Sequence, residues 1–285
     1  MKNVLLLYKK STYAHYFTDK RVKYSWISPR FDNMARFQRT HIQHYRTMTE
    51  IEQYLRVKKI SYVAEMRGRM IDYSGFDFVL TVGGDGTFLE AAQQVTRQLI
   101  LGINSDPVWS VGRFCAANSH TFRKVLDSIL SGKFRTQILN RLKMKIRDTG
   151  ATFNILNDVL VCHENPATMS RYILKIRGIG DEHRSSGIWI SPAAGSTGAI
   201  RSAGGKILPL LSDWWQYMPR ELYYKTGQTH KLRGGTLTAQ DRLTLVSAMK
   251  DGVAYVDGSH LKHSLRLGDE VTIRKSSEPL KMVLA

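Results

Sequence analysis

Cysteine is nearly absent from the sequence. Only Cys115 and Cys162 occur among 285 residues, and they lie far apart. Without a Cys-x-x-Cys pair or a cysteine–histidine spacing typical of zinc, we expect neither a disulfide scaffold nor a structural zinc site, and we predict no metal-ligating residue. Two isolated cysteines are typical of a reducing compartment, so a cytoplasmic location is expected.

Long apolar runs are missing as well. No segment approaches the roughly 20 apolar residues that span a bilayer. The run Val4–Tyr8 is too short for a signal peptide, and Lys9 and Lys10 follow it directly. We therefore expect Val4–Tyr8 to be a buried strand, and we expect no membrane partner.

Acidic residues are few beside the basic ones, 24 against 42, which leaves a net charge of +18. Such an excess attracts nucleic acids, anionic lipids or phosphorylated small molecules. The charge is spread along the chain, and the sequence has no RNA-recognition, zinc-finger or basic-zipper signature. A field that attracts small phosphorylated molecules therefore fits better than sequence-specific nucleic-acid binding, while a basic surface without a function explains the charge as well.

Strand-like and helix-like segments alternate in the first half of the chain, which predicts a parallel sheet covered by helices on both faces. The predicted strands are Val4–Tyr8, Ile60–Met66, Phe76–Val82 and Leu99–Ile103, and the predicted helices are Met34–Tyr45, Thr49–Val57, Thr87–Arg97 and Thr121–Leu130. Gly132 lies just past the last helix, where a glycine often ends one.

From Thr136 onward, short alternating segments separated by glycine-containing turns predict a β-rich domain. We expect an α/β domain over residues 1–134 and a β-rich domain over 135–285, with the last strands able to return to the first domain. The predicted strands are Leu142–Ile146, Phe153–Val161, Arg171–Ile176, Gly187–Ile190, Arg242–Ser247, Ala254–Asp257, Val271–Arg274 and Lys281–Leu284.

The strongest local signal is Gly83–Thr87, with the sequence Gly-Gly-Asp-Gly-Thr, between a buried strand and a helix. Glycines let the backbone approach a ligand closely, and the N–H groups at the start of a helix suit a phosphate. No lysine follows, so this is not the common P-loop. A carboxylate beside phosphates costs electrostatic energy, so Asp85 is expected to accept a proton or to help hold magnesium. A tight hairpin turn is the alternative.

Two further segments carry polar groups among apolar neighbours. Ser191–Lys206 is rich in small residues and hydroxyls, which permit backbone contact with a flat ligand. Its apolar flanks argue against a flexible surface loop. Asn157 and Asp158 interrupt an otherwise buried strand, where they could bind ribose hydroxyls or amide groups, or form a turn or bulge.

With these motifs in this order, the chain resembles the NAD kinase family from about residue 76 to its end. The matching segments share the small, polar and glycine-rich character of that family's signatures. They are Gly83–Thr87, Gly102–Asn104, Gly112–Phe114, Asn157–Asp158, Gly195–Thr197, Ser202–Gly205 and Asp257–Gly258. Diacylglycerol and sphingosine kinases share the first signature, but the Gly-Ser-Thr and Ser-Ala-Gly-Gly segments distinguish NAD kinases from them.

The resemblance implies transfer of the γ-phosphoryl group of ATP, with Mg²⁺, to the 2′-hydroxyl of the adenosine ribose of NAD or NADH, in a homodimer or homotetramer. Asp85 would be the general base. The residues implied in binding the nucleotides fall into two groups. The first group would contact the ATP phosphates: Gly83, Gly84, Gly86 and Thr87. The second group contains Asn104, Phe114, Asn157, Asp158, Arg184, Thr197, Gly198 and Ser202. Within the second group, Asn157, Asp158, Thr197 and Ser202 would hold the dinucleotide.

The chain is more similar still to the plant NADH kinase branch, at Asn104–Pro107, Arg184–Gly187, Ala193–Thr197 and Leu267–Asp269. It departs from typical NAD kinases where Ala199 replaces a tyrosine and Ser186 replaces an aspartate. These departures favour the NADH-using branch. A lipid kinase with an acyl-binding groove, and a non-catalytic nucleic-acid-binding protein suggested by charge alone, are the alternatives.

Overall fold

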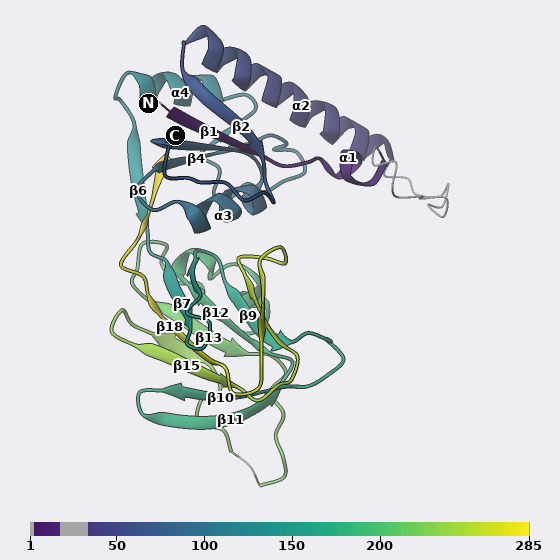
Figure 1. Ribbon diagram of the computed structural model, residues 1–285, viewed down its shortest axis with the longest axis vertical. Helices are drawn as coiled ribbons and strands as arrows, with labels where there is room; N and C mark the ends of the chain where they lie inside the picture. Colours follow the sequence, from purple (N-terminus) through teal and green to yellow (C-terminus); the bar gives the residue numbers. More distant parts are fainter. Residues whose placement is uncertain (1–2, 18–33, 228, 285) are drawn as a thin grey trace. The chain divides into compact units, whose positions relative to one another are not determined.

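The computed structural model describes residues 3–17, 34–227 and 229–284 (Figure 1). The chain divides into two compact units. The first comprises Met1–Gln137 together with Lys281–Ala285, and the second comprises Ile138–Leu280.

A mainly parallel sheet forms the centre of the first unit, in the order β2-β1-β3-β4-β19-β6, with β5 beside β4. Its strands are β1 (Asn3–Tyr8), β2 (Ser61–Met66), β3 (Phe78–Gly83), β4 (Leu99–Asn104), β5 (Ala117–Asn118), β6 (Arg135–Leu139) and β19 (Leu280–Leu284). Strand β1 pairs in parallel with both β2 and β3, and β4 pairs in parallel with β3 and β19. The last strand of the chain therefore belongs to the sheet of the first unit.

Helices cover both faces of this sheet, as expected from the alternation in the sequence. They are α1 (Thr12–Phe17), α2 (Met34–Val57), α3 (Asp85–Gln94) and α4 (Phe122–Leu130). Figure 1 shows α2 and α4 on one face and α3 on the other. Side chains of a strand alternate between its faces, so Leu6 and Leu80 pack in the core with α2 and α4. Phe88 is fully buried on the side of α3 that packs on β3.

The prediction of two helices over Met34–Val57 was wrong, because α2 runs through the expected break. Thr47 donates its hydroxyl to the carbonyl of Gln43 at 2.8 Å, a hydrogen bond within the helix at the expected break. Arg46 pairs with Glu50 one turn on, at 2.9 Å, and this i,i+4 pair spans the same point.

The second unit is β-rich, as predicted. Two antiparallel sheets share one apolar core, in the manner of a sandwich. The first sheet, in the order β11-β10-β15-β18-β7-β8, contains β7 (Leu142–Ile146), β8 (Thr152–Ile155), β10 (Ser170–Ile176), β11 (Ile179–Ser185), β15 (Arg242–Ser247) and β18 (Glu270–Lys275). The second, in the order β14-β13-β12-β9-β16-β17, contains β9 (Val159–His163), β12 (Ile188–Pro192), β13 (Trp215–Pro219), β14 (Gly235–Leu237), β16 (Gly252–Val256) and β17 (Lys262–Leu265). The short helices η1 (Ala193–Gly195) and α5 (Ala199–Ser202) follow β12.

Two predictions within this unit were wrong. The expected strand Phe153–Val161 is divided into β8 and β9, which lie in different sheets. The second error is the absence of β11 from the predicted strands: the chain turns tightly at Arg177 and Gly178, both with positive φ, and pairs β11 with β10. Strand β11 escaped prediction because its inward-facing positions are polar: His183 and Ser185 are buried.

Candidate functional site

The order of the first sheet determines where a ligand should bind. Strand β1 connects outward to β2 on one side, while β3 connects to β4 on the other. In open parallel sheets, ligands bind outside the carboxyl ends of the strands at this change of direction. Here those ends are Tyr8–Lys9 and Gly83–Gly84, and the N–H of Lys9 donates to the carbonyl of Val82 at 3.3 Å. The glycine-rich segment therefore lies at the favoured position in the sheet.

Asp85 is the first residue of α3, and both of its carboxylate oxygens are held by backbone N–H groups. Arg113 donates to Oδ2 at 3.0 Å, and Phe114 donates to Oδ1 at 2.8 Å. Asp85 thus lies at the positive end of the α3 helix dipole. Helix α3 begins two residues earlier than predicted, so Asp85 and Gly86 belong to its first turn rather than to the turn before it.

The glycines of this segment have close side-chain neighbours. A Cβ on Gly83 would lie 2.4 Å from Thr87 Oγ1, and a Cβ on Gly84 would lie 2.5 Å from Ser110 Oγ. A Cβ on Gly86 would lie 3.0 Å from Arg67 Nη1. The backbone is thus packed as closely as glycine allows.

Two positively charged side chains that were not predicted from the sequence lie beside the glycines. Lys9 follows β1, and its Cδ would lie 3.4 Å from a Cβ on Gly83. Arg67 follows β2 and approaches Gly86, as described above. Burial lowers the pKa of the Lys9 ammonium; nearby Asp106 opposes this and Arg67 adds to it. Each residue directly follows a predicted parallel strand, and that position was the signal that could have identified it.

The segment after β4 is shaped by Asn104. Its Oδ1 accepts the N–H of Asp106 at 3.1 Å, and its Nδ2 donates to the carbonyl of Ser110 at 2.9 Å. Gly112 has a φ of +59°, and a Cβ there would lie 2.3 Å from Asn104 Nδ2. Phe114 stacks on Phe88 with ring centroids 5.5 Å apart. Both predicted binding residues, Asn104 and Phe114, thus contact the protein's own groups and hold the segment that carries the donors to Asp85.

A second cluster lies in the second unit, where β8 ends. The carboxylate of Asp257 accepts the N–H groups of three successive residues, Leu156, Asn157 and Asp158, at 2.7 to 3.2 Å. The N–H of Asp257 donates to the carbonyl of Asp158 at 2.8 Å. These bonds take the place of hydrogen bonds to a neighbouring strand. They explain why Asn157 and Asp158 interrupt the strand that was predicted over Phe153–Val161. Asp257 was a motif match but was not predicted as a site residue.

Asp158 is buried, and its Oδ2 accepts a hydrogen bond from Asn157 Nδ2 at 2.9 Å. Burial, and then the charge of Asp257, raise the pKa of Asp158 to about 7. The second glycine-rich segment lies directly against this pair. A Cβ on Gly195 would lie 1.6 Å from the carbonyl oxygen of Asn157, and a Cβ on Gly198 would lie 3.3 Å from Asp158 Oδ2.

The structure therefore brings the Asn157–Asp158 pair together with the segment containing Thr197 and Gly198, two motifs that are separated in the sequence. Thr197 is half-buried, and Ser202 lies exposed at the end of α5. The predicted residue Arg184 lies elsewhere.

Arg184 is an exposed residue of β11, in the other sheet of the unit. It lines a cavity of about 400 Å³ together with Tyr223 and Lys225. The Arg184 carbonyl accepts the N–H of Tyr223 at 2.8 Å.

Among the described residues, no helix is long and apolar enough to cross a membrane.

Comparisons with known proteins agree on one family. The family model described as the ATP-NAD kinase N-terminal domain matches residues 30–134. A protein named probable NADH kinase, from Oryza sativa subsp. japonica, is 32% identical over 264 residues, covering 85% of this chain and 81% of that protein. The NADH kinase of Arabidopsis thaliana is 34% identical over 232 residues, covering 73% of each chain.

Two solved structures share the fold. A crystal structure of an NAD kinase from Archaeoglobus fulgidus in complex with ATP has a TM-score of 0.69 at 21% identity, covering 98% of this chain and 92% of that one. A crystal structure of yeast NADH kinase complexed with NADH has a TM-score of 0.69 at 15% identity, covering 100% of this chain and 84% of that one.

Proposed function

The chain belongs to the NAD kinase family, and we propose that it transfers the γ-phosphoryl group of ATP to the 2′-hydroxyl of the adenosine ribose of NADH or NAD. The observation that carries this proposal is Asp85, a carboxylate fixed among glycines at the ligand-binding edge of the parallel sheet. A phosphate-binding loop alone needs no acidic side chain, whereas a transfer to a hydroxyl needs a group that accepts its proton.

In the reaction, the ribose 2′ oxygen forms a bond to the γ-phosphorus, and the bond from that phosphorus to the bridging oxygen breaks. ADP leaves, and the hydroxyl proton passes to Asp85. Each Asp85 oxygen accepts one backbone N–H, which orients the carboxylate and leaves it able to accept a further hydrogen bond from the hydroxyl. Positioning and charge neutralisation supply most of the catalysis in such transfers.

The donor phosphates are proposed to bind over Gly83, Gly84, Gly86 and Thr87, at the start of α3. Backbone N–H groups and the helix dipole provide positive potential there. Lys9 and Arg67 add two positive side chains next to the same glycines. These cations would neutralise the charge that ADP carries as it leaves.

Magnesium is proposed to accompany ATP rather than to occupy a site made by the protein. Asp85 is the one carboxylate of the Gly83–Thr87 segment, and both its oxygens already accept backbone N–H groups. Thr87 Oγ1 is buried and has no hydrogen-bond partner among the described residues. Mg²⁺ keeps most of its ligands from phosphates and water, and this donor set fits that arrangement.

The dinucleotide is proposed to bind at Asn157, Asp158, Thr197 and Ser202. Asn157 and Asp158 offer an amide and a carboxyl group, and the glycines beside them permit backbone contact with a flat ligand. Ala199 and Ser186 provide neither an aromatic ring nor a carboxylate to attract a positive nicotinamide. We therefore propose that NADH is used at least as well as NAD, with which the names of the two plant relatives agree.

A homo-oligomeric state and a cytoplasmic location are also proposed. Both cysteines are free thiols, and Cys162 is buried. Free thiols are typical of a reducing compartment. Light scattering of the purified chain measures the oligomeric state; a monomeric mass contradicts that part of the proposal.

The test of the activity is an assay of the purified chain with ATP and either NADH or NAD, followed by detection of NADPH or NADP with a dehydrogenase specific for the phosphorylated cofactors. An analogue of NADH that lacks the adenosine 2′-hydroxyl is the matched control and should yield no product. Phosphorylation of diacylglycerol or sphingosine without phosphorylation of either dinucleotide would overturn the assignment in favour of a lipid kinase.

A further inference from the structure

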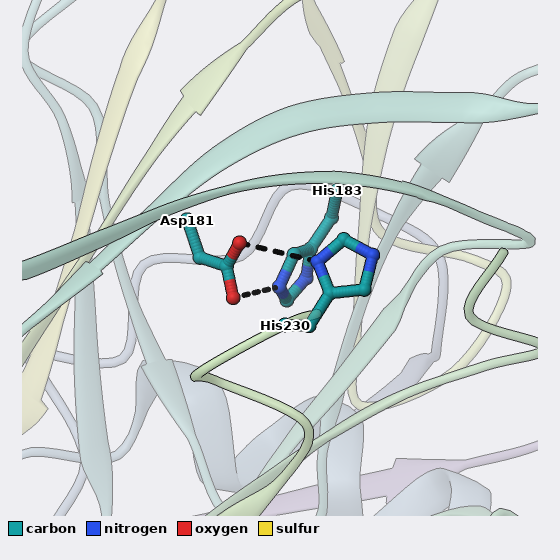
Figure 2. Close-up of side chains that lie close together, drawn as sticks. All are labelled: Asp181, His183 and His230. Atoms are coloured by element: carbon teal, nitrogen blue, oxygen red, sulfur yellow. Dashed lines mark hydrogen bonds and ion pairs between the residues drawn. The ribbon is translucent and has the colours of Figure 1, made fainter. Parts of the chain in front are cut away.

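Three potential metal ligands meet in the second unit, outside the proposed dinucleotide site (Figure 2). Asp181 and His183 project from the same face of β11, and His230 lies in the segment between β13 and β14. One ligand atom from each lies within 4.8 Å of the others. Sequence spacing predicts no such site, because His230 lies 49 positions after Asp181.

His183 is the least satisfied polar side chain of the three. It is 0% exposed, and neither of its ring nitrogens has a hydrogen-bond partner among the described residues. Its Nε2 lies 3.4 Å from Asp181 Oδ2, close in distance but outside hydrogen-bond geometry. A buried, unpaired imidazole is costly, whereas a metal bond to its lone pair would offset that cost.

His230 is held by a contact that orients a metal ligand. Its Nε2 lies 3.1 Å from the carbonyl oxygen of Tyr223, so this nitrogen carries the proton. In the neutral ring, Nδ1 then presents a lone pair toward Asp181 Oδ1, which is 3.1 Å away. Two lone pairs facing each other repel unless a cation lies between them. Histidine ligands commonly donate their second N–H to a backbone carbonyl in this way.

Asp181 is fixed by the same segment. Its Oδ2 accepts the N–H groups of Lys231 at 2.7 Å and Leu232 at 3.0 Å. These bonds leave Oδ1 as the oxygen best able to coordinate an ion. With bonds of about 2.0 Å in tetrahedral geometry, neighbouring ligand atoms lie about 3.3 Å apart. The observed separation of 3.1 Å between Asp181 Oδ1 and His230 Nδ1 matches that value.

We propose that Asp181, His183 and His230 bind one divalent transition-metal ion, with Zn²⁺ as the best match. Two imidazoles and a carboxylate suit zinc and its neighbours, whereas Mg²⁺ and Ca²⁺ take oxygen ligands. Three protein ligands leave a fourth position for water. His230 also borders the cavity of about 400 Å³ that Arg184, Tyr223 and Lys225 line. The ion would fasten this segment to β11 and thereby set the wall of that cavity.

The competing explanation is a second proton on His230, which would make an ion pair with Asp181 and need no metal. The full chain, freed of any histidine tag and of metal by chelation, is titrated with Zn²⁺ by calorimetry and with Co²⁺ by visible absorption. We expect one ion per chain, the absorption of tetrahedral Co²⁺, and an unfolding midpoint that rises with Zn²⁺. Absence of stoichiometric binding overturns the proposal.

Variants identify the ligands. His230→Gln and Asp181→Asn should each weaken Zn²⁺ binding by more than about 10-fold, since even residues behind the ligands contribute that much. His263 is a half-buried histidine of β17 in the same unit, and the His263→Gln variant should bind Zn²⁺ as tightly as the wild type does. Unchanged affinity in His230→Gln, or an equal loss in His263→Gln, refutes the assignment.

Nitrogen-15 spectra of the wild-type histidines keep the test independent of variant folding. Zinc should shift Nδ1 of His230 and Nε2 of His183. An imidazolium pattern on His230 that Zn²⁺ leaves unchanged supports the ion pair and overturns the metal site. None of these measurements depends on kinase activity, so failure of this proposal and failure of the proposed function are distinguishable.

Discussion

Replacement of Asp158 by asparagine should make the second unit more stable at alkaline pH. In the native protein, burial and then the charge of Asp257 raise the pKa of Asp158 from 3.8 to about 7, so the ionised form is disfavoured there. A carboxyl whose pKa is raised by folding stabilises the native state below its unfolded pKa. That contribution is lost as the pH rises through its folded pKa.

The size of the effect follows from the two pKa values. At about 1.4 kcal/mol per pKa unit, the change from 3.8 to about 7 corresponds to about 4 kcal/mol. The wild type should lose that stability between about pH 4 and pH 7. Asp158→Asn should not lose it, because the asparagine amide is neutral throughout and its oxygen can still accept the bond from Asn157 Nδ2.

Urea unfolding followed by tryptophan fluorescence from pH 4.5 to 8.5 measures this directly. Three of the five tryptophans, Trp189, Trp214 and Trp215, lie in the second unit, so the signal reports mainly on that unit. Asp251→Asn, a change at an exposed aspartate of the same unit, is the control. If the free energy of unfolding depends on pH equally in the wild type and in Asp158→Asn, the proposed electrostatic environment of Asp158 is refuted.

Three further changes test the two proposed sites. A Cβ added at Gly84 would lie 2.5 Å from Ser110 Oγ, so Gly84→Ala is made in a Ser110→Ala background that removes this hydroxyl. The double variant should bind ATP more weakly than Ser110→Ala alone, as measured by calorimetry. Equal affinity for ATP in the two variants would mean that no ligand approaches the backbone of Gly84. Lys9→Met should raise the KM for ATP by about 10-fold or more, as expected for a lost hydrogen bond to a charged group, and an unchanged KM would remove Lys9 from the phosphate site. The double change Ser186→Asp with Ala199→Tyr should shift the ratio of kcat/KM values toward NAD, by about 0.5–2 kcal/mol from the aromatic ring alone; a native preference for NAD that the double change leaves alone would contradict the proposed acceptor site.

Local sequence patterns were enough to predict the parallel sheet and its glycine-rich turn. Val4–Tyr8 is apolar along its length because both faces of β1 are covered, and this pattern is visible without a structure. Gly132 follows α4 with a φ of +70°, as expected of a glycine that ends a helix. Each of these features depends on residues close together in the sequence.

The contacts that define the sites depend on residues far apart. Asp257 accepts the N–H of Asn157 from 100 positions along the chain, so neither residue alone indicates the bond. The convergence of His230 on Asp181 likewise depends on the packing of a long connection onto β11. Polar side chains at the buried positions of β11 also conceal the strand, because they break the usual alternation of apolar and polar residues.

The most direct test of the account compares wild type with Asp85→Asn in the ATP-dependent phosphorylation of NADH. We expect NADPH formation by the wild type and a kcat lower by about 10²–10⁴-fold in the variant, with ATP still bound. Asparagine offers one carbonyl oxygen in place of two, so one of the N–H groups of Arg113 and Phe114 loses its acceptor while the fold is retained. A wild type that phosphorylates neither NADH nor NAD, or an Asp85→Asn variant within a few-fold of wild-type activity, would contradict the central claim.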